Sequence, residues 1–433
     1  MTERTGNCDD APQGPQAWTP PEAVLPSPAA METLPLAPPP GATPAAPPGP
    51  LSGAPRRAPP LAANGRVLLR GLTRPELTTW LADVFDAPPL AAERLWIGLH
   101  RQRAADLASI PGLPGDLRRR LADAGKVDAI ALDEVRTAAD GTRKLLYRLE
   151  SGAIVESVLI PGSERATLCL SSQVGCAMGC HFCLTAKMGL QDNLSTAEII
   201  DQLVIARRHF GHERPITGVV FMGMGEPLHN LDAVLPATEI LVDPTGIDLS
   251  GRRVTVSTSG IVPAIDRLGA ESPAQLAVSL NATTDEVRDW LMPVNRKWPI
   301  AALVAAMRRF PVRPRERIVV EYVLLAGVND SEADVARLAE HLDGLACKVN
   351  LIAFNPHPGS ELRRPTDAAV EAFRDALRAR RITTAVRRTR GDAEMAACGQ
   401  LGRPSVISRR PARGLPLSPP PTGADPGDPL HDR

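Results

Sequence analysis

The sequence predicts an α/β fold made of parallel β/α units, and three observations support this prediction. Six β-like runs alternate with helical patterns after residue 165. The runs are continuously apolar, as in strands of a parallel sheet that is covered on both faces. Proline is concentrated at the ends, with 17 of the 44 prolines in residues 1–60 and 8 in residues 404–433. The folded core should therefore lie between these ends.

The two ends are predicted to be disordered extensions, residues 1–62 and 404–433. Their Pro-, Ala- and Gly-rich segments can form extended polyproline stretches but present no periodic apolar face to bury. The chain between them is long enough for one large domain and a small one.

Residues 63–125 are predicted to form the small domain, which is helical. "LTRPELTTWLADV" begins with Thr73 as a cap, and Glu76 follows three residues later. A run of basic residues near the end of this domain is either a phosphate-binding surface or a solvated helix face. The run is Arg118, Arg119 and Arg120. Residues 126–165 are interpreted as a β-rich linker region.

Residues 166–403 carry the predicted β/α units. The six runs are residues 166–172, 217–223, 253–259, 275–282, 317–325 and 348–356. Ser195 and Glu198 have the spacing of a capping box at the start of one intervening helix, and "SEADVARLAEHL" repeats this signal. Active-site residues are expected at the C-terminal ends of such strands.

Composition excludes several classes of protein. The 49 basic and 49 acidic side chains balance, so any nucleic-acid contact must come from local patches. Only 14 residues are aromatic, too few for a binder that stacks successive bases. No apolar stretch approaches 18 residues, and the N-terminus has no leader pattern. We expect a cytoplasmic protein without membrane contact.

Three of the seven cysteines form a tight motif, Cys176-x3-Cys180-x2-Cys183. An odd number of cysteines without a secretion signal favours metal or redox chemistry over a disulfide framework. Three thiolates on a four-iron cluster leave one iron open, which S-adenosylmethionine chelates in the radical SAM superfamily. The alternative is a structural zinc site made of the three cysteines and His181.

Polar or small residues follow several of the predicted strands. Gly225 would let the backbone approach a ligand, and Glu226 offers a carboxylate to an ammonium or hydroxyl group. The others are Ser257, Ser279, Leu280, Asn281 and Asn355. Each could be an ordinary turn residue, but their common placement at one end of the strands favours a binding site.

Several segments together resemble the radical SAM RNA adenine methyltransferases. They include "CLSSQVGCAMGCHFC", "FMGMGEPLHNLDAV", "LAVSLNATTDEVRDWLMPVNRKWP" and "RRTRGDAEMAACGQL", within a match from about residue 66 to 403. The resemblance implies a partial (βα)6 TIM-like radical SAM barrel, one [4Fe-4S] cluster and bound S-adenosylmethionine. It assigns the cluster to the three-cysteine motif, the cofactor to the polar residues just named, and RNA binding to the small helical domain with its basic run. Asn281 stands where histidine is frequent in the family, and an amide can still donate and accept hydrogen bonds.

The resemblance also implies three catalytic residues. Cys398 matches the cysteine that becomes S-methylcysteine and then links the protein covalently to the RNA. Cys169 matches the cysteine that resolves this adduct through a transient disulfide with Cys398. Glu156 matches the carboxylate that accepts the proton. From the residues alone, the two cysteines would be structural thiols and Glu156 an ordinary surface carboxylate.

The resulting expectation is methylation of C2 of adenosine in 23S rRNA, with tRNA left open as a second substrate. Two alternatives stay open: C8 methylation by the same chemistry, and a non-catalytic zinc-binding RNA module. The expected partners are RNA and an electron donor such as flavodoxin or ferredoxin, and the expected state is a monomer. Basic residues preceding Cys398 could contact phosphates and favour its thiolate. They are Arg387, Arg388 and Arg390.

Overall fold

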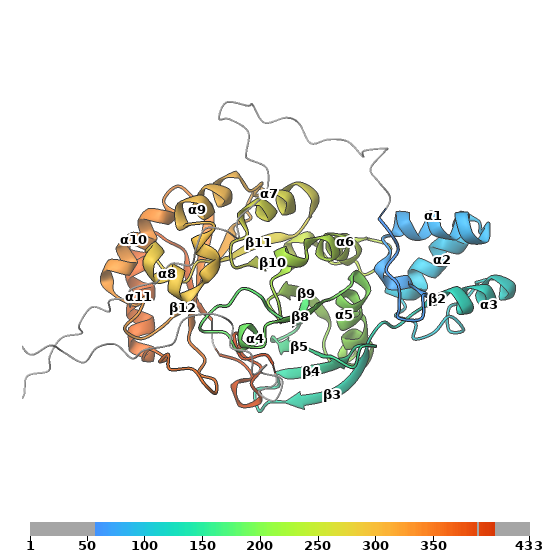
Figure 1. Cartoon of the computed structure of the whole chain (residues 1–433), viewed down its shortest axis with the longest axis horizontal. Coiled ribbons are helices and arrows are strands. Elements are labelled where there is room, and N and C mark those ends of the chain that lie inside the picture. Colours follow the sequence, from blue (N-terminus) through green and yellow to red (C-terminus); the bar gives the residue numbers. More distant parts are fainter. Residues whose placement is uncertain (1–56, 388, 403–433) are drawn as a thin grey trace, which may run out of the picture. The chain divides into compact units, whose positions relative to one another are not determined.

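The computed structural model describes residues 57–387 and 389–402 (Figure 1). Residues 59–402 belong to one compact unit. Most of the predicted N-terminal extension, the whole C-terminal extension and Arg388 lie outside the described residues. The last residues assigned to the N-terminal extension contact the helical part, since the carbonyl oxygen of Pro60 accepts the backbone N–H of Leu68 at 2.8 Å.

The helical part contains three helices and two short parallel strands. They are β1 (Val67–Leu68), α1 (Arg74–Phe85), α2 (Pro89–His100), α3 (Gly115–Ala124) and β2 (Gly125–Lys126). The predicted capping box at α1 is confirmed, because Thr73 accepts from the Glu76 N–H and its own N–H donates to the Glu76 carboxylate. Leucines of α1 and α2 pack with the buried Trp96 to form this part of the core.

A buried ion pair joins the helical part to helix α5 (Thr196–Phe210). The Arg70 guanidinium lies 2.8 Å from the carboxylate of Asp201, and both side chains are inaccessible to solvent. Asp128 pairs with Arg70 as well and, at 2.9 Å, with Arg208. Buried charges are tolerated when they are paired and hydrogen-bonded in this way. The guanidinium of Arg208 is therefore engaged by a carboxylate of the protein itself.

One ten-stranded sheet forms the core of the protein, in the order β14-β13-β12-β11-β10-β9-β6-β5-β4-β3 (Figure 1). Its first three strands along the chain are antiparallel, namely β3 (Ala131–Thr137), β4 (Arg143–Arg148) and β5 (Ile154–Pro161). The parallel strands are β6 (Ala166–Cys169), β9 (Ile216–Phe221), β10 (Val254–Thr258), β11 (Gln275–Ser279), β12 (Ile318–Leu324), β13 (Cys347–Ala353) and β14 (Thr384–Arg387). The six predicted runs correspond to β6 and β9 to β13, which lie side by side in chain order. Strand β14 was not predicted.

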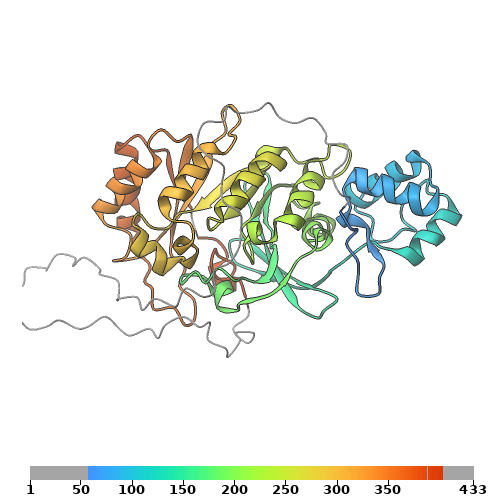
Figure 2. The same cartoon turned by 45° about the horizontal axis from the view of Figure 1, so that its top comes forward.

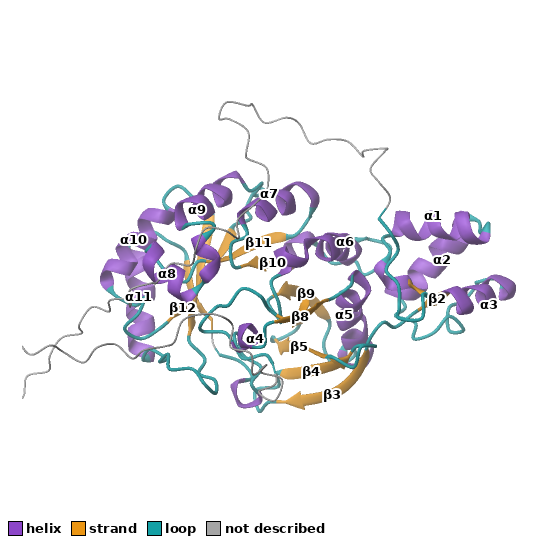
Figure 3. Ribbon diagram, viewed as in Figure 1, coloured by secondary structure: helices purple, strands orange, loops and turns teal. Residues whose placement is uncertain are grey.

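Helices connect the parallel strands and lie outside them (Figures 2 and 3). Besides α5 they are α6 (Leu231–Val242), α7 (Val262–Glu271), α8 (Asp285–Leu291), α9 (Ile300–Arg309), α10 (Glu332–Leu342) and α11 (Asp367–Ala379). Capping boxes at Ser195 and Ser331 start α5 and α10, as predicted. The linear strand order means that the described sheet does not close on itself. The predicted α/β fold with a partial barrel is confirmed.

Parallel strands bring their C-terminal ends to one edge of the sheet. At this edge the cysteine motif is framed by a small antiparallel pair, β7 (Gln173–Gly175) and β8 (Leu190–Asn193), with the short helix α4 (Leu184–Lys187) between them. No helix within residues 57–387 and 389–402 is long and apolar enough to cross a membrane.

Candidate active site

A cavity of about 1030 Å³, open to solvent, lies at the C-terminal ends of the parallel strands. The predicted residues that line it are Cys176, Cys180, Cys183, Gly225, Glu226, Ser257, Ser279, Asn281, Asn355, Arg387 and Cys398. Sequence positions more than 200 residues apart therefore meet in one site.

The three cysteines of the motif line one side of the cavity. Burial raises the pKa of Cys176 to about 12, and burial followed by the neighbouring thiols raises that of Cys180 well above its usual value. Among the described residues, no three His, Cys, Asp or Glu side chains are grouped as ligands of one metal ion. A four-iron cluster does not require the three thiols to converge on one ion, because each cysteine binds a separate iron. His181 instead packs edge-on against Trp290.

Glu226 is held rigidly after strand β9. Its carboxylate accepts the backbone N–H of Ser259 at 2.7 Å and that of Leu228 at 3.1 Å. Burial raises the pKa of Glu226, while these N–H groups lower it. The preceding Gly225 has φ +97°, and a Cβ there would lie 2.5 Å from the Cβ of Gln173. This close packing explains why glycine precedes Glu226.

The end of β11 is organised by a residue that the sequence did not single out, Arg288. Its buried guanidinium donates to the carbonyl oxygens of Leu280 at 2.9 Å and Ser259 at 2.7 Å. Asn281 has a left-handed backbone with φ 55°, and its side-chain oxygen accepts the N–H of Val323 at 2.8 Å. Leu280 is fully buried and does not line the cavity. Arg288 thus ties the ends of β10 and β11 together.

Cys398 lies in a segment, residues 389–402, that follows β14 and covers the cysteine motif. The N–H of Leu184 donates to the Gly399 carbonyl oxygen at 2.7 Å, and the Thr185 hydroxyl donates to that of Leu401 at 2.7 Å. Asn355 donates to the Cys398 carbonyl oxygen at 3.2 Å. We call residues 389–402 the Cys398 segment.

Cys169 ends strand β6 behind the cavity wall, and the structure brings it near Cys398. Burial raises the pKa of Cys169 to about 12, and a charge on Cys398 would raise it further, whereas Arg387 lowers it. The pKa of Arg387 is raised, with Cys398 as the largest cause. Arg387 lines the cavity near the two cysteines, and its guanidinium donates to the sulfur of Met222 at 3.5 Å. Its predicted phosphate contact did not anticipate this position. The described cysteines form no disulfide bond.

Glu156 lies on β5 and does not line the cavity. It is 2% exposed, so the interpretation as a surface carboxylate is wrong. Its carboxylate lies 2.9 Å from the ammonium group of Lys144 and accepts the N–H of Gly402 at 3.0 Å. It thus lies beneath the Cys398 segment.

Of the basic residues predicted to contact RNA, two in α3 also support the local fold. Arg118 donates to the carbonyl oxygen of Leu113 at 3.1 Å, and Arg120 donates to that of Phe85 at 3.3 Å. Arg119 is exposed. Arg390 is exposed and lies 3.9 Å from Asp140, near the start of the Cys398 segment.

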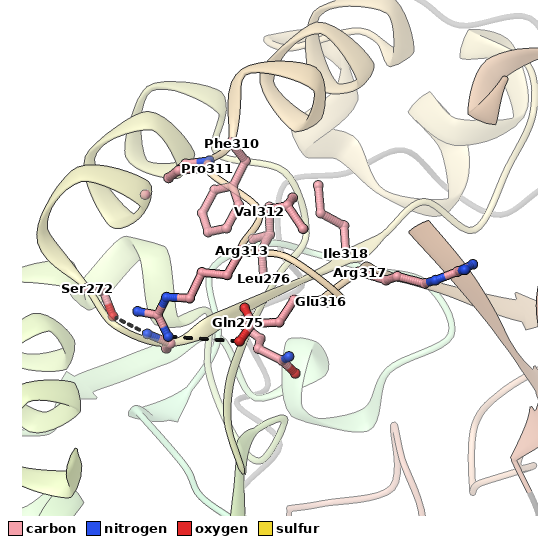
Figure 4. Close-up of a pocket in the computed structure, with 12 residues that line it drawn as sticks. Ser272, Gln275, Leu276, Phe310, Pro311, Val312, Arg313, Glu316, Arg317 and Ile318 are labelled. Carbon is pink, nitrogen blue, oxygen red and sulfur yellow. Dashed lines mark hydrogen bonds and ion pairs between the residues drawn. The ribbon is translucent and has the colours of Figure 1, made fainter. Parts of the chain in front are cut away.

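A second cavity, of about 570 Å³, lies at the opposite end of the strands, where β11 and β12 begin (Figure 4). Its polar side chains are Ser272, Gln275, Arg313, Glu316 and Arg317, of which Arg313 and Glu316 lie 3.9 Å apart. None of the predicted site residues lines it.

The larger cavity has polar atoms that are suited to a bound cofactor. Within the described residues, Ser259 Oγ and Glu321 Oε2 are buried without a hydrogen-bond partner, and both residues line the cavity. Buried polar groups are normally satisfied, so a polar ligand such as S-adenosylmethionine fits this site. The three adjacent thiols fit an iron–sulfur cluster.

Comparisons with known proteins agree with this geometry. Residues 170–339 match the model of the radical SAM superfamily. The chain is 46% identical over 335 residues to the dual-specificity RNA methyltransferase RlmN of Syntrophobacter fumaroxidans, covering 77% of this chain and 98% of that relative. It is 47% identical over 333 residues to RlmN of Geobacter sulfurreducens, covering 77% and 91%.

A solved structure gives the same result. The crystal structure of a radical SAM methyltransferase from Sphaerobacter thermophilus matches with a TM-score of 0.73 and 42% identity, covering 77% of this chain and 98% of that one. The identity with curated relatives extends over nearly their whole length. The chain therefore belongs to the RlmN family of dual-specificity RNA methyltransferases, within the radical SAM superfamily.

Proposed function

We propose that this protein is a radical SAM RNA methyltransferase that methylates C2 of adenosine in 23S rRNA, with tRNA as a candidate second substrate. One observation carries the proposal: a single cavity gathers the three-cysteine motif, the Glu226 loop and Cys398. The first two could serve any enzyme of the superfamily, whereas a cysteine on a covering segment suits a covalent step between protein and RNA. The names of the relatives support RNA as the substrate.

The residues that would hold the cofactors are those that line the cavity. Cys176, Cys180 and Cys183 would bind the cluster, and S-adenosylmethionine would be held by the polar residues at the strand ends. When bound, the two would supply a methyl group and a carbon-centred radical, which adenine C2 requires because it is a very weak nucleophile.

Three residues of the chain would carry out the remaining chemical steps. Cys398 would accept the methyl group on its sulfur and form the covalent link to the base. Cys169 would attack that sulfur, which releases the methylated RNA and leaves a disulfide between the two cysteines. Glu156 would take the proton from the modified carbon. Since Glu156 lies beneath the Cys398 segment and does not line the cavity, this last role requires the segment to move.

Charge supports the role of Cys169. Burial favours the protonated thiol of Cys169, and Arg387 is the positive group that opposes this effect. A cation near a buried thiol favours its thiolate form, and this helps Cys169 to act as a nucleophile. We propose this role for Arg387 in place of a phosphate contact. Surface arginines such as Arg119 remain candidates for RNA contacts.

The proposal includes a cytoplasmic monomer that receives electrons from a flavodoxin or ferredoxin. C8 methylation by the same chemistry is the nearest alternative, since every residue named here would serve both. A zinc-binding RNA module has less support, because His181 packs on Trp290 and the described residues hold no group of three ligands for one ion.

The test is an anaerobic reaction of the reconstituted enzyme with 23S rRNA or tRNA, a reductant and methyl-labelled S-adenosylmethionine. Mass spectrometry of the nucleosides should find labelled 2-methyladenosine, whereas 8-methyladenosine would establish the alternative. Cys398→Ala and Cys169→Ala should both lose the product. Methylation by Cys398→Ala would overturn the covalent mechanism, and absence of label in both RNAs would overturn the proposed substrate.

A further inference from the structure

A buried ion pair lies beneath the Cys398 segment, and one of its members has no role in the proposed chemistry. Lys144 on β4 and Glu156 on β5 are diagonal neighbours on the same face of an antiparallel pair, since Glu156 is opposite Leu146. Each side chain is only 3% exposed, and the ammonium nitrogen lies 2.9 Å from the carboxylate oxygen. A buried pair of charges needs additional hydrogen bonds to compensate for the loss of water.

The Cys398 segment supplies these additional bonds, at two points on either side of the cysteine. Lys144 Nζ donates to the carbonyl oxygen of Met395 at 3.0 Å. The same oxygen of Glu156 that contacts Lys144 accepts the backbone N–H of Gly402 at 3.0 Å. Met395 precedes Cys398 by three residues and Gly402 follows it by four. One ion pair therefore holds both ends of the stretch that carries the reactive sulfur.

The backbone at both contacts is unusual. Met395 has φ 52° and Gly402 has φ 128°, both in the left-handed half of conformational space. A Cβ at Gly402 would lie 2.6 Å from the sulfur of Met188. A non-glycine residue with positive φ persists only when its surroundings hold it, and at Met395 the bond from Lys144 contributes to this.

We propose that Lys144 is a positioning residue: paired with Glu156, it clamps Met395 and Gly402 and thereby keeps the sulfur of Cys398 in the cavity. The inference rests on the proposed role of Cys398 and adds a residue to it. Lys144 does not line the cavity. It acts through the segment that it holds.

The test measures how accessible Cys398 is, and it needs no RNA. Anaerobically reconstituted holoenzyme is treated with iodoacetamide, and the alkylation rate of each cysteine is read by peptide mass spectrometry. Cys347 is the internal reference, since it is 6% exposed and lies at the start of β13, at the opposite end of the strands from the Cys398 segment. In Lys144→Met, Cys398 should react roughly tenfold faster, while Cys347 keeps its rate.

Three further variants make the result specific. Lys144→Arg keeps the charge and the donors, so its Cys398 should be alkylated within about twofold of the rate in the unmodified protein. Lys126→Met is the matched control, because Lys126 also pairs with a glutamate, Glu150, but does not touch the Cys398 segment. This variant should leave the alkylation rate of Cys398 unchanged. The double variant Lys144→Met/Glu156→Gln removes both charges and replaces Lys144→Met if that protein fails to fold.

Two results would overturn the inference. In the first, Cys398 in Lys144→Met is alkylated no faster than in the unmodified protein. In the second, Cys398 and Cys347 accelerate together, which would mean a general loss of stability. The proposed function fails separately, if the unmodified enzyme produces no methylated adenosine. If it does produce it, the clamp predicts that Lys144→Met lowers methyl transfer to Cys398 and that Lys144→Arg restores it.

Discussion

The side-chain amide of Asn355 donates a hydrogen bond to the carbonyl oxygen of Cys398, over 3.2 Å. Asn355 follows strand β13, and its own oxygen accepts the hydroxyl of Thr389 at 2.9 Å. The residue that the sequence predicts as a cofactor contact is therefore also a tether of the Cys398 segment. The proposed cofactor site and the proposed reactive cysteine therefore share one side chain at the end of the barrel.

This double contact predicts the effect of Asn355→Asp. Aspartate has the same shape and keeps the bond from Thr389, but it places an oxygen against the Cys398 carbonyl oxygen. The loss of a partly buried hydrogen bond, with two acceptors facing each other, costs on the order of 1–3 kcal/mol. Transfer of labelled methyl groups to Cys398 should fall by about tenfold or more, as measured on the intact protein.

Asn64→Asp is the control for the added charge, because Asn64 accepts the N–H of Arg66 at 3.2 Å on the surface and keeps that bond as aspartate. It should methylate Cys398 at the unmodified rate. A normal rate in Asn355→Asp would show that the tether is dispensable.

Gly225→Ala should weaken cofactor binding. The new Cβ would lie 2.5 Å from the Cβ of Gln173 and 2.8 Å from its backbone nitrogen, so the loop that carries Glu226 must shift. Equilibrium dialysis with S-adenosylmethionine should show a Kd raised at least about tenfold. Gly327→Ala is the matched control, since Gly327 has φ 72° but nothing within 4 Å of the added Cβ. Binding that weakens equally in both variants would assign the effect to backbone strain alone.

Features that depend on neighbouring residues could be predicted from the sequence. The capping boxes at Thr73, Ser195 and Ser331 need only side chains three residues from the cap, and all three form. The parallel strands were predicted because both of their faces are covered, which makes their sequences continuously apolar. Strand β14 was missed because it has four residues and ends in Arg387, whose charge is compensated only within the folded site.

Contacts between distant residues account for most of what the sequence missed in the site. Lys144 and Met395 are 251 positions apart, and no local pattern marks either of them. Arg288 looks like an ordinary helix residue, yet its guanidinium reaches the carbonyl oxygen of Ser259, 29 positions away. Such roles appear only once the sheet brings its strand ends to one edge. The cluster motif was predictable because all three of its thiols lie on one loop.

Loss of any motif cysteine should prevent cluster assembly. Cys183→Ser replaces a soft thiolate ligand with a hydroxyl group that binds iron poorly. Iron analysis after anaerobic reconstitution should find about four irons in the unmodified protein and far fewer in the variant. Cys347→Ser is the control, because Cys347 is buried at the opposite end of β13, and it should keep its iron. Full iron loading of Cys183→Ser would contradict the assignment.

The stability of the helical part should depend on pH through His100. This residue is buried at the end of α2, its ring centroid lies 4.0 Å from that of Trp96, and within the described chain neither ring nitrogen has a hydrogen-bond partner. Burial first, and then the charge of Arg70, lower its pKa to about 3. The unfolded chain, with a histidine pKa of about 6.5, binds more protons between these two values. The free energy of unfolding should therefore fall as the pH is lowered from 6.5 toward 3.

Substitution isolates the contribution of His100. For one group with these two pKa values, the contribution to the free energy of unfolding falls by about 2 kcal/mol between pH 7 and pH 5. His100→Phe keeps a ring against Trp96 and cannot take up a proton, so its loss over this interval should be smaller by about that amount. At pH 7 the variant should be at least as stable, because no unsatisfied nitrogen is buried. Urea unfolding of both proteins at the two pH values measures the difference, and equal losses would mean that His100 does not stay neutral in the folded state.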